Sequence, residues 1–428
     1  MSQTATPAAA PPPPATAPAP AAPAPAGAAQ PAPSYVDTPA LLNRWQLIGM
    51  SVAIVFGIVS ALLQFVGWQA DGRAADDTEQ LVRVQEIQSS LLRADALATN
   101  AFLVGGLENT DQRAEYDEAI DGVLRRIADA AEAQPADRRA LATLNELVDD
   151  YATYIAQARA NNRQGFPVGA GYQTTASDQL RNEAIPVLDA LVEANTDRAD
   201  GAMNGQHPVW LLLLGILVLA ALWWLNRELA RTFRRRFNKG LAIAAAIVAA
   251  VTLVTVVGAW LRDNSNDSLR DGEFAEAVSS ATARTAANDA KANESLRLIK
   301  RGSGADNEKT WGEKAQVVEK NVPADDIGEW NTYAERHQQI VELDDSNRWE
   351  EAVVIATSVD ESTGATAPFD RFDEMLAKDV EKASASAIDD LRSGRWLALV
   401  LSGLTVLLGV AAAVSVARGI GERRREFS

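Results

Sequence analysis

The sequence predicts an all-α membrane protein with four transmembrane helices and two extracytoplasmic domains that resemble four-helix bundles. Three features of the 428-residue chain lead to this fold class. The chain contains four apolar spans, two long segments with helical spacing of their apolar residues, and an uneven distribution of charge. No strand pattern is evident in either long segment.

Each apolar span has about the 20 residues that a helix needs to cross a bilayer. The spans cover residues 47–67, 209–225, 240–261 and 396–417. Their centres contain no Asp, Glu, Lys, Arg or His, which ion and proton pathways generally need, so the sequence argues against a transporter. The small residues within 242–250 and 403–413 favour close packing between these helices.

Charge sets the predicted orientation. The loop 226–239 carries six basic residues and one acid, and short basic loops remain in the cytoplasm. The segment 68–208 has 12 arginines, no lysine and 24 acids, whereas 262–395 has 17 basic and 29 acidic residues, so each has a net charge of −12. We expect a multi-pass protein of the cell membrane, with both long segments outside and both termini, including the tail 418–428, in the cytoplasm.

Composition argues against an enzyme. The chain has no Cys, only two His, and no Gly-rich phosphate loop that follows a strand, so we expect no cofactor and no metal. No nucleic-acid partner is expected. Residues 1–40, rich in Pro and Ala, are predicted to form a disordered cytoplasmic tail. The alternative is a ligand for a proline-binding groove.

The segment 68–208 predicts four helices. The first continues the first span, with apolar residues at alternating spacings of three and four. Turn residues separate the helices at Gly105-Gly106, at Pro135-Ala136-Asp137 and within 165–169. The pattern predicts an up-down-up-down bundle whose Gly105 and Gly165 breaks lie at the far apex, with the Pro135 turn near the membrane.

The segment 262–395 repeats this plan. The sequence DALA at residues 95–98 is echoed by DAKA at 289–292, and PAD at 135–137 is echoed by PAD at 323–325. These echoes predict an internal duplication. Its second apex is expected at Arg301-Gly302-Ser303-Gly304, where the glycines indicate a helix cap or, alternatively, an anion-binding turn. A further break within 362–368 precedes the last helix.

Few side chains outside the apolar pattern indicate chemistry. We expect Asp149-Asp150 and Asp344-Asp345 on solvated faces or in turns, and His337 at a surface or boundary position, rather than at a metal. Asp95 lies beside the apolar seam of the first helix. We expect it to pair with a basic residue of a neighbouring helix, which is usually a structural contact.

Three sequences within the long segments resemble a known family. They are RADALATNAFLVGGLE (93–108), ANNRQGFPVG (160–169) and ESLRLIKRGSG (294–304), and they are similar to the GlnX-type membrane proteins of actinobacteria. The span–bundle–span plan also looks like the sensory half of methyl-accepting chemoreceptors. The likeness covers roughly residues 40–425 and implies no catalytic residues. It implies an extracytoplasmic amino-acid-binding lipoprotein of the GlnH type and a cytoplasmic serine/threonine kinase of the protein kinase G type as partners.

The leading hypothesis is therefore a transmembrane sensor or adaptor that relays an extracytoplasmic signal, amino-acid availability, to a cytoplasmic kinase. The alternative is a structural membrane scaffold that holds envelope partners without signalling. The sequence leaves open whether the chain forms a homo-oligomer.

Two sets of residues are predicted to bind partners. The extracytoplasmic set lies at the apices and comprises Asn161, Asn162, Arg163, Gln164, Phe166 and Arg301. The cytoplasmic set lies in the basic loop and comprises Arg231, Phe233, Arg234, Arg235, Arg236 and Phe237. The simpler interpretation of the loop is that its charges fix topology and contact anionic membrane lipid.

Overall fold

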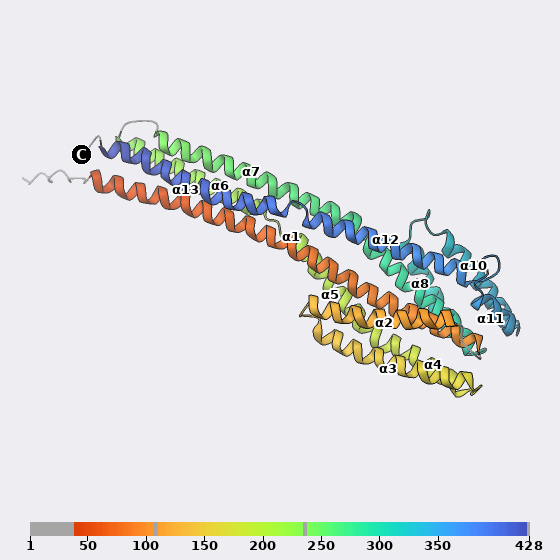
Figure 1. Cartoon of the computed structure of the whole chain (residues 1–428). Helices are drawn as coiled ribbons and strands as arrows, with labels where there is room; N and C mark the ends of the chain where they lie inside the picture. Colours follow the sequence, from red (N-terminus) through yellow and green to blue (C-terminus); the bar gives the residue numbers. More distant parts are fainter. Residues whose placement is uncertain (1–37, 106–109, 234–237, 426–428) are drawn as a thin grey trace, which may run out of the picture.

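The computed structural model describes residues 38–105, 110–233 and 238–425, and every regular element within them is a helix (Figure 1). The all-α prediction is confirmed for these residues. The helices form a long rod of four at one end and two helical groups at the other (Figure 1).

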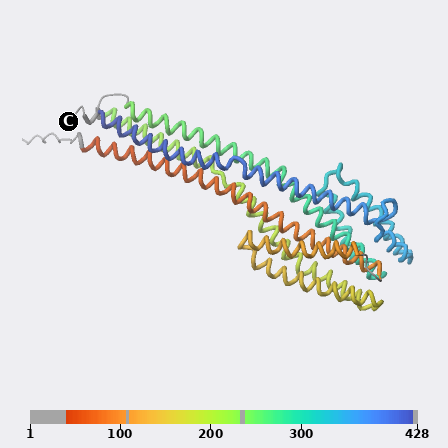
Figure 2. Tube along the Cα trace, viewed as in Figure 1, coloured from red at the N-terminus to blue at the C-terminus, as the bar shows by residue number. Residues whose placement is uncertain are grey.

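The longest element is α1 (Thr38–Val104), a single helix of 67 residues (Figure 2). At about 1.5 Å per residue it is about 100 Å long. It contains the first apolar span and continues without a break into the bundle seam, as the sequence predicts. It ends at Gly105, whose positive φ of 68° matches the usual glycine cap after a helix.

Within the described ranges, four helices are long and apolar enough to cross a membrane: α1, α6 (Pro208–Phe233), α7 (Lys239–Leu269) and α13 (Arg395–Arg425). Large apolar side chains face outward along them. Leu217 and Leu407, for example, are 68% and 66% exposed. Outward apolar side chains on four packed helices are typical of a multi-pass membrane protein.

Small residues bring the spans into backbone contact. A Cβ added to Gly409 of α13 would lie 2.7 Å from the Cα of Gly57 of α1, and one added to Gly240 of α7 would lie 2.6 Å from the Cα of Gly419. Polar side chains add bonds between α1 and α13, since Ser402 donates to the carbonyl of Ala61 at 2.9 Å. The close packing predicted for 403–413 is confirmed at Gly409, whereas the contact of Gly240 with Gly419 lies outside the predicted stretches.

The first helical group packs the outer half of α1 against α2 (Thr110–Ala133), α3 (Arg138–Arg163), α4 (Val168–Gln179) and α5 (Ile185–Met203). One π-helical turn, η1 (Leu180–Ala184), joins α4 to α5. The breaks at Gly105, Pro135 and Gly165 fall between helices as predicted. The Pro135 turn lies at the end of the group nearer the spans, and the Gly165 turn lies at the far end (Figure 1).

The second helical group comprises α8 (Ala275–Ile299), α9 (Ala305–Asn321), α10 (Gly328–Asp345), α11 (Trp349–Thr357) and α12 (Thr366–Arg392). A second π-helical turn, η2 (Arg270–Phe274), joins α7 to α8. The sequence predicts four helices here, but the structure has five. The additional break follows Asp345, where Asn347 takes a left-handed φ of 58°. Asn is among the residues that tolerate this conformation, so no glycine marks the turn.

The two helical groups share α1. Leu91 of α1 packs in the core of the first group, whereas Leu103 packs in the core of the second. Closer to the spans, Ala74 and Ala75 pack with residues of α5, α7 and α12. Both groups therefore lie side by side along one helix (Figure 1).

The helices that leave the spans differ in their continuity. The path from α5 to α6 is interrupted at residues 204–207, and the path from α12 to α13 is interrupted at Ser393 and Gly394. The path from α7 to α8 is distorted at Gly272, which has non-helical backbone angles (φ −104°, ψ −111°). Only α1, among these four described paths, is an unbroken helix.

The Gly57–Gly409 crossing provides a test of the packing. Gly409→Leu should push α1 away from α13, because its first added carbon meets backbone that cannot rotate aside. We expect a loss of about 1–3 kcal/mol, typical of overpacking, seen as a lower midpoint of thermal unfolding in detergent. Gly403→Leu is the matched control, because a Cβ at Gly403 meets open space. Equal midpoints for the two variants would contradict the crossing.

Candidate functional site

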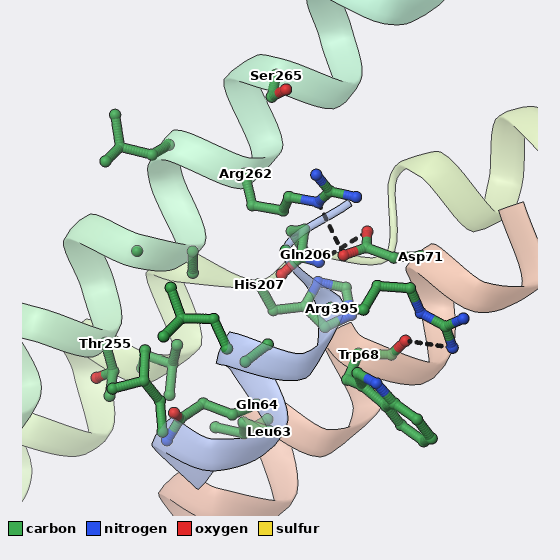
Figure 3. A pocket seen from close by; sticks show the side chains of 18 of the residues that line it. Leu63, Gln64, Trp68, Asp71, Gln206, His207, Thr255, Arg262, Ser265 and Arg395 are labelled. Atoms are coloured by element: carbon green, nitrogen blue, oxygen red, sulfur yellow. Dashed lines mark hydrogen bonds and ion pairs between the residues drawn. The ribbon is translucent and has the colours of Figure 1, made fainter. Parts of the chain in front are cut away.

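A polar cluster marks the place where the spans meet the helical groups (Figure 3). The carboxylate of Asp71 on α1 is buried. It accepts hydrogen bonds from Arg262 (2.9 Å) and Asn266 (3.1 Å) of α7 and from Gln206 (3.1 Å) of the segment that precedes α6. We call this cluster, together with Arg395, the junction.

The junction also reaches the fourth path. Arg262 donates to the carbonyl of Leu391 at 2.7 Å, at the end of α12. The guanidinium of Arg395, at the start of α13, lies 5.0 Å from the ring centre of Trp68 on α1. The other three paths between spans and helical groups are therefore tied to a short stretch of α1. The composition suits mechanical coupling, and the described residues contain no group of His, Cys, Asp and Glu that could hold a metal.

A second polar cluster joins the two helical groups farther from the spans. Arg181, in the π-helical turn η1, donates to Asp95 of α1 and to Asp289 of α8, both at 2.8 Å. Tyr151 (3.1 Å) and Ser177 (2.7 Å) also donate to Asp95. The prediction that Asp95 pairs with a basic residue of a neighbouring helix is confirmed, and the partner also bridges to the second group.

Burial makes this bridge sensitive to the loss of a partner. The side chain of Asp95 is fully buried, and that of Arg181 is mostly buried. Burial opposes ionisation of Asp289, but Arg181 and Lys314 outweigh it and hold the pKa of Asp289 below its usual value. A π-bulge in a helix often occurs at functional positions, and here it supplies the residue that spans both groups.

Three further contacts hold the groups together along α1. Arg93 of α1 pairs with Asp370 of α12 at 2.7 Å. Arg392 of α12 pairs with Glu79 of α1 at 2.8 Å. Arg284 pairs with the buried Asp373 within the second group and also reaches Ser89 of α1. Arginine side chains thus stabilise the interface between the two helical groups at several positions along α1.

The second helical group contains a buried charged cluster around His337. The sequence predicts a surface or boundary position for His337, and this prediction is wrong, because the residue is 1% exposed. Its ring stacks on Trp311, with 3.7 Å between ring centres. Along α10, Trp330, Tyr333, His337 and Ile340 recur at spacings of three and four, so the histidine belongs to the core-facing stripe.

Both ring nitrogens of His337 face carboxylates. Nδ1 lies 2.9 Å from Glu294 and Nε2 lies 3.3 Å from Glu308. Burial opposes protonation, but the two hydrogen bonds outweigh it and raise the pKa of His337. Glu294 also accepts from the buried Lys291 at 2.7 Å, and these partners lower the pKa of Glu294 despite its burial.

The acidic pairs predicted on the surface divide into two cases. Asp149 and Asp150 are exposed, as expected. Asp344 instead lies 3.2 Å from the guanidinium of Arg297, which also contacts Asp345 at 2.5 Å. The prediction of a merely solvated pair is therefore wrong at Asp344. The apical turn at Arg301 and Gly302 has positive φ angles, which fits the predicted helix cap.

The predicted extracytoplasmic binding residues occupy two places. Asn161 to Phe166 form the end of α3 and the turn after it, where Arg163, Gln164 and Phe166 are exposed. Asn162 donates to the carbonyl of Phe102 at 2.9 Å and so fastens α3 to the end of α1. Arg301 belongs to the second helical group, and its guanidinium lies 3.9 Å from the ring centre of Trp349.

The predicted cytoplasmic binding residues are only partly described. Arg231 is exposed near the end of α6 and lies 3.7 Å from Glu228. Phe233 is the last residue of α6. Arg234, Arg235, Arg236 and Phe237 lie outside the described residues. Their role in binding stays a prediction.

Sequence reasoning missed Arg181, Asp71 and Lys291. Each is a charged residue within an otherwise helical pattern, and the sequence alone does not show which neighbour it meets. Lys291 lies in the stretch 286–298 of α8, which is buried on all sides in the structure, and the sequence signal for it is the Ala-rich pattern around its charges.

Comparison with known proteins supports a sensory role for the first helical group. Residues 70–204 match the model of the family described as Actinobacterial sensor domain. The matched stretch is the part of α1 beyond its span together with α2 to α5. No curated protein matches the chain. The chain is thus similar to actinobacterial sensor proteins over less than half of its length.

The bridge at Arg181 predicts a large loss of stability. Arg181→Met leaves the buried Asp95 without a cation and Asp289 with Lys314 alone, and an unpaired buried charge typically costs about 3–5 kcal/mol. Chemical denaturation of the purified protein measures the change. Arg348→Met is the control, because the pair with Glu351 is exposed and worth at most about 1 kcal/mol. Asp95→Asn with Asp289→Asn should recover part of the loss in the Arg181→Met background.

The cluster at His337 predicts a defined pH dependence. Because the folded pKa of His337 is raised, its contribution to stability is complete below the unfolded value of about 6.5 and is lost as the pH rises through the folded value. The stability difference between the native protein and His337→Gln should therefore shrink above neutral pH. Thermal unfolding from mildly acidic to alkaline pH measures this. A difference that grows with pH would contradict the protonated histidine.

Proposed function

We propose that the protein is a transmembrane sensor-adaptor that relays an extracytoplasmic signal to a cytoplasmic partner. The observation that carries the proposal is the continuity of α1. One unbroken helix contributes side chains to both cores and supplies Asp71 to the junction. Its apolar span also packs against the apolar span of α13. A helix in this position responds to either helical group.

The relay follows from the difference between α1 and the other three paths. Breaks at residues 204–207, Gly272 and Gly394 allow α6, α7 and α13 to adjust near the junction. The unbroken α1 instead moves as a rod, and shifts of about 1–2 Å between packed helices are sufficient for transmembrane signals. Such a shift reaches the opposite end of the spans, where Asn238 holds the start of α7 against α13 by donating to Gly419.

The direction of the signal rests on charge. The basic loop 226–239 and the acidic segments around it favour both helical groups outside and both termini inside the cell. In this orientation the exposed Arg163, Gln164 and Phe166 lie at the extracytoplasmic apex, far from the membrane. An exposed turn at the end of a rigid bundle is a suitable contact for a protein partner.

The identity of the partners rests on the resemblance to GlnX-type proteins. We infer that an amino-acid-binding lipoprotein of the GlnH type contacts the apex and that a serine/threonine kinase of the protein kinase G type responds at the basic loop. The amino acid then acts as the signal. The match to the Actinobacterial sensor domain supports the sensing step.

An internal duplication is supported by the bridge between the groups. Asp95 and Asp289, the first residues of the echoed sequences DALA and DAKA, accept hydrogen bonds from the same arginine. We infer that the two groups are related copies that meet through these equivalent positions. The second echo differs in its surroundings, because Asp137 is buried whereas Asp325 is exposed.

A scaffold without signalling is favoured by one observation. The arginine pairs that fasten the two groups would also suit a rigid support for envelope partners. The two functions differ in one measurable respect. A scaffold binds its extracytoplasmic partner without changing the cytoplasmic side.

The relay predicts that a variant with a more flexible α1 still binds the lipoprotein but no longer transmits the signal to the cytoplasmic side. In the Cys-free chain, Thr232→Cys should change its labelling rate in nanodiscs when the lipoprotein and its amino acid are added. Adding Gln69→Gly and Arg73→Gly, two exposed positions of α1 between span and bundle, costs about 1 kcal/mol each in helix propensity. We expect this variant to bind the lipoprotein normally and to lose most of the rate change.

The control carries the same change elsewhere. Arg139→Gly with Thr143→Gly alters two exposed positions of α3 at the same spacing and should keep the response. On intact cells, Thr143→Cys should react with an impermeant reagent and Thr232→Cys should not. If Thr232→Cys without further substitutions binds the lipoprotein but its labelling rate does not change, the scaffold function is favoured. If Thr232→Cys is labelled on intact cells, the proposed orientation in the membrane is wrong.

A further inference from the structure

A groove separates α7 and α13 beside the junction. These helices touch at Gly240 and Gly419 near the other end of the spans. Two cavities fill the space toward the junction, one of about 370 Å³ beneath Arg262 and Arg395 and one of about 220 Å³ deeper between the helices. Both are lined by Val254, Thr255 and Leu401, so they adjoin each other (Figure 3 shows the first).

The groove is long, narrow and apolar below its mouth. From Arg395 to Leu408 on α13 it extends about 20 Å, at about 1.5 Å per residue. Half of a bilayer's hydrocarbon core is about 15 Å thick, so this length covers one leaflet and a headgroup. Its deeper walls are mostly aliphatic and include Ile247, Val251, Leu404 and Leu408.

The groove opens sideways to its surroundings. Val254 on one wall is 53% exposed, and Leu404 on the other is 45% exposed. Gly258 also lines the mouth, and a Cβ at this position would meet open space. An apolar groove of this kind does not hold ordered water, whereas the neighbouring bilayer supplies acyl chains at the same depth.

The mouth contains a cation that is not neutralised. Arg262 is paired with Asp71, but Arg395 has no carboxylate within ion-pair distance among the described residues. Its buried Nε atom has no hydrogen-bond partner there, and its Nη2 atom donates only a long bond of 3.4 Å to the carbonyl of Trp68. His207 also lines the mouth, and its ring can donate to an anion.

We propose that this groove binds one anionic membrane phospholipid, with an acyl chain between α7 and α13 and the phosphate group at Arg395. The length, the apolar walls, the lateral opening and the single unneutralised cation all fit this ligand class. The site does not depend on the signalling role. Because the bound chain lies between two spans, its presence fixes their separation near the junction.

The test uses the full chain in phosphatidylcholine nanodiscs that contain a minority of phosphatidylglycerol. Electron spin resonance of a tail-labelled phosphatidylglycerol or phosphatidylcholine probe measures the motionally restricted fraction. The native protein should restrict the phosphatidylglycerol probe in several-fold preference over the phosphatidylcholine probe. Arg395→Gln should remove this preference but still restrict a chain.

Filling the groove should remove the bound chain itself. Gly258→Leu places a side chain in the open space of the mouth, and Ala398→Phe does so from the opposite wall. Both should lose the specifically restricted component. Gly403→Leu is the matched control, because this glycine also faces open space but does not line the groove. Circular dichroism of each variant identifies folded samples, and the two filling variants serve as independent tests.

Native mass spectrometry provides a second readout, with one phosphatidylglycerol expected on the native protein and on Gly403→Leu. The proposal is wrong if folded Gly258→Leu and Ala398→Phe restrict and retain lipid as Gly403→Leu does. It is also wrong if Arg395→Gln keeps the preference for phosphatidylglycerol. Restriction of spin-labelled stearic acid in place of phosphatidylglycerol would assign the groove to a free fatty acid and contradict the proposal.

Discussion

The structure depends on one constraint, which is that α1 must suit three environments along an unbroken helix. Near its start it presents small residues to α13 and apolar residues outward, and farther along it presents one face to each core. Any local change in its direction would misplace the contacts at Asp71, Asp95 and Leu103 together. The other helices are fitted around it and have breaks where their directions change.

Charged side chains, as well as apolar ones, determine how the two helical groups meet. Arg93, Arg181 and Arg392 each join elements from both groups, and apolar contacts between the groups lie at Leu103 near the end of α1 and in the cluster of Ala74 and Ala75 with α5 and α12. Buried ion pairs contribute less to net stability than apolar packing of the same volume. As a hypothesis for this protein, they specify one relative placement of the groups, because a shifted interface would separate the buried Asp289 from Arg181 and leave it with Lys314 alone.

Much of the fold follows from the sequence, and most of the polar sites do not. Period and turn chemistry predict α1, α2, α3 and the path from α4 to α5 with the breaks between them, because each apolar stripe and each turn sequence acts locally, but not the π-helical turn η1 within the last path. The break at Asn347 was not predicted, because Asn takes a left-handed turn without the usual glycine signal. His337 was misplaced because a charged cluster inside a core looks like a surface pattern until its partners on α8 and α9 are known. Long-range pairs such as Arg181 with Asp289 cannot be derived from spacing within one helix.

The pairing of the first and last spans has a consequence for biosynthesis. Ser402 donates to the carbonyl of Ala61, so the partners are separated by 341 residues along the chain. During synthesis the first span enters the bilayer long before α13 is made. Until then, the glycine-containing face of α1 contacts lipid or another helix. Contacts between such distant segments form slowly and leave unfinished surfaces exposed. Maturation of this protein is therefore expected to be limited by arrival of its final helix, and membrane chaperones and quality-control proteases have that interval in which to act.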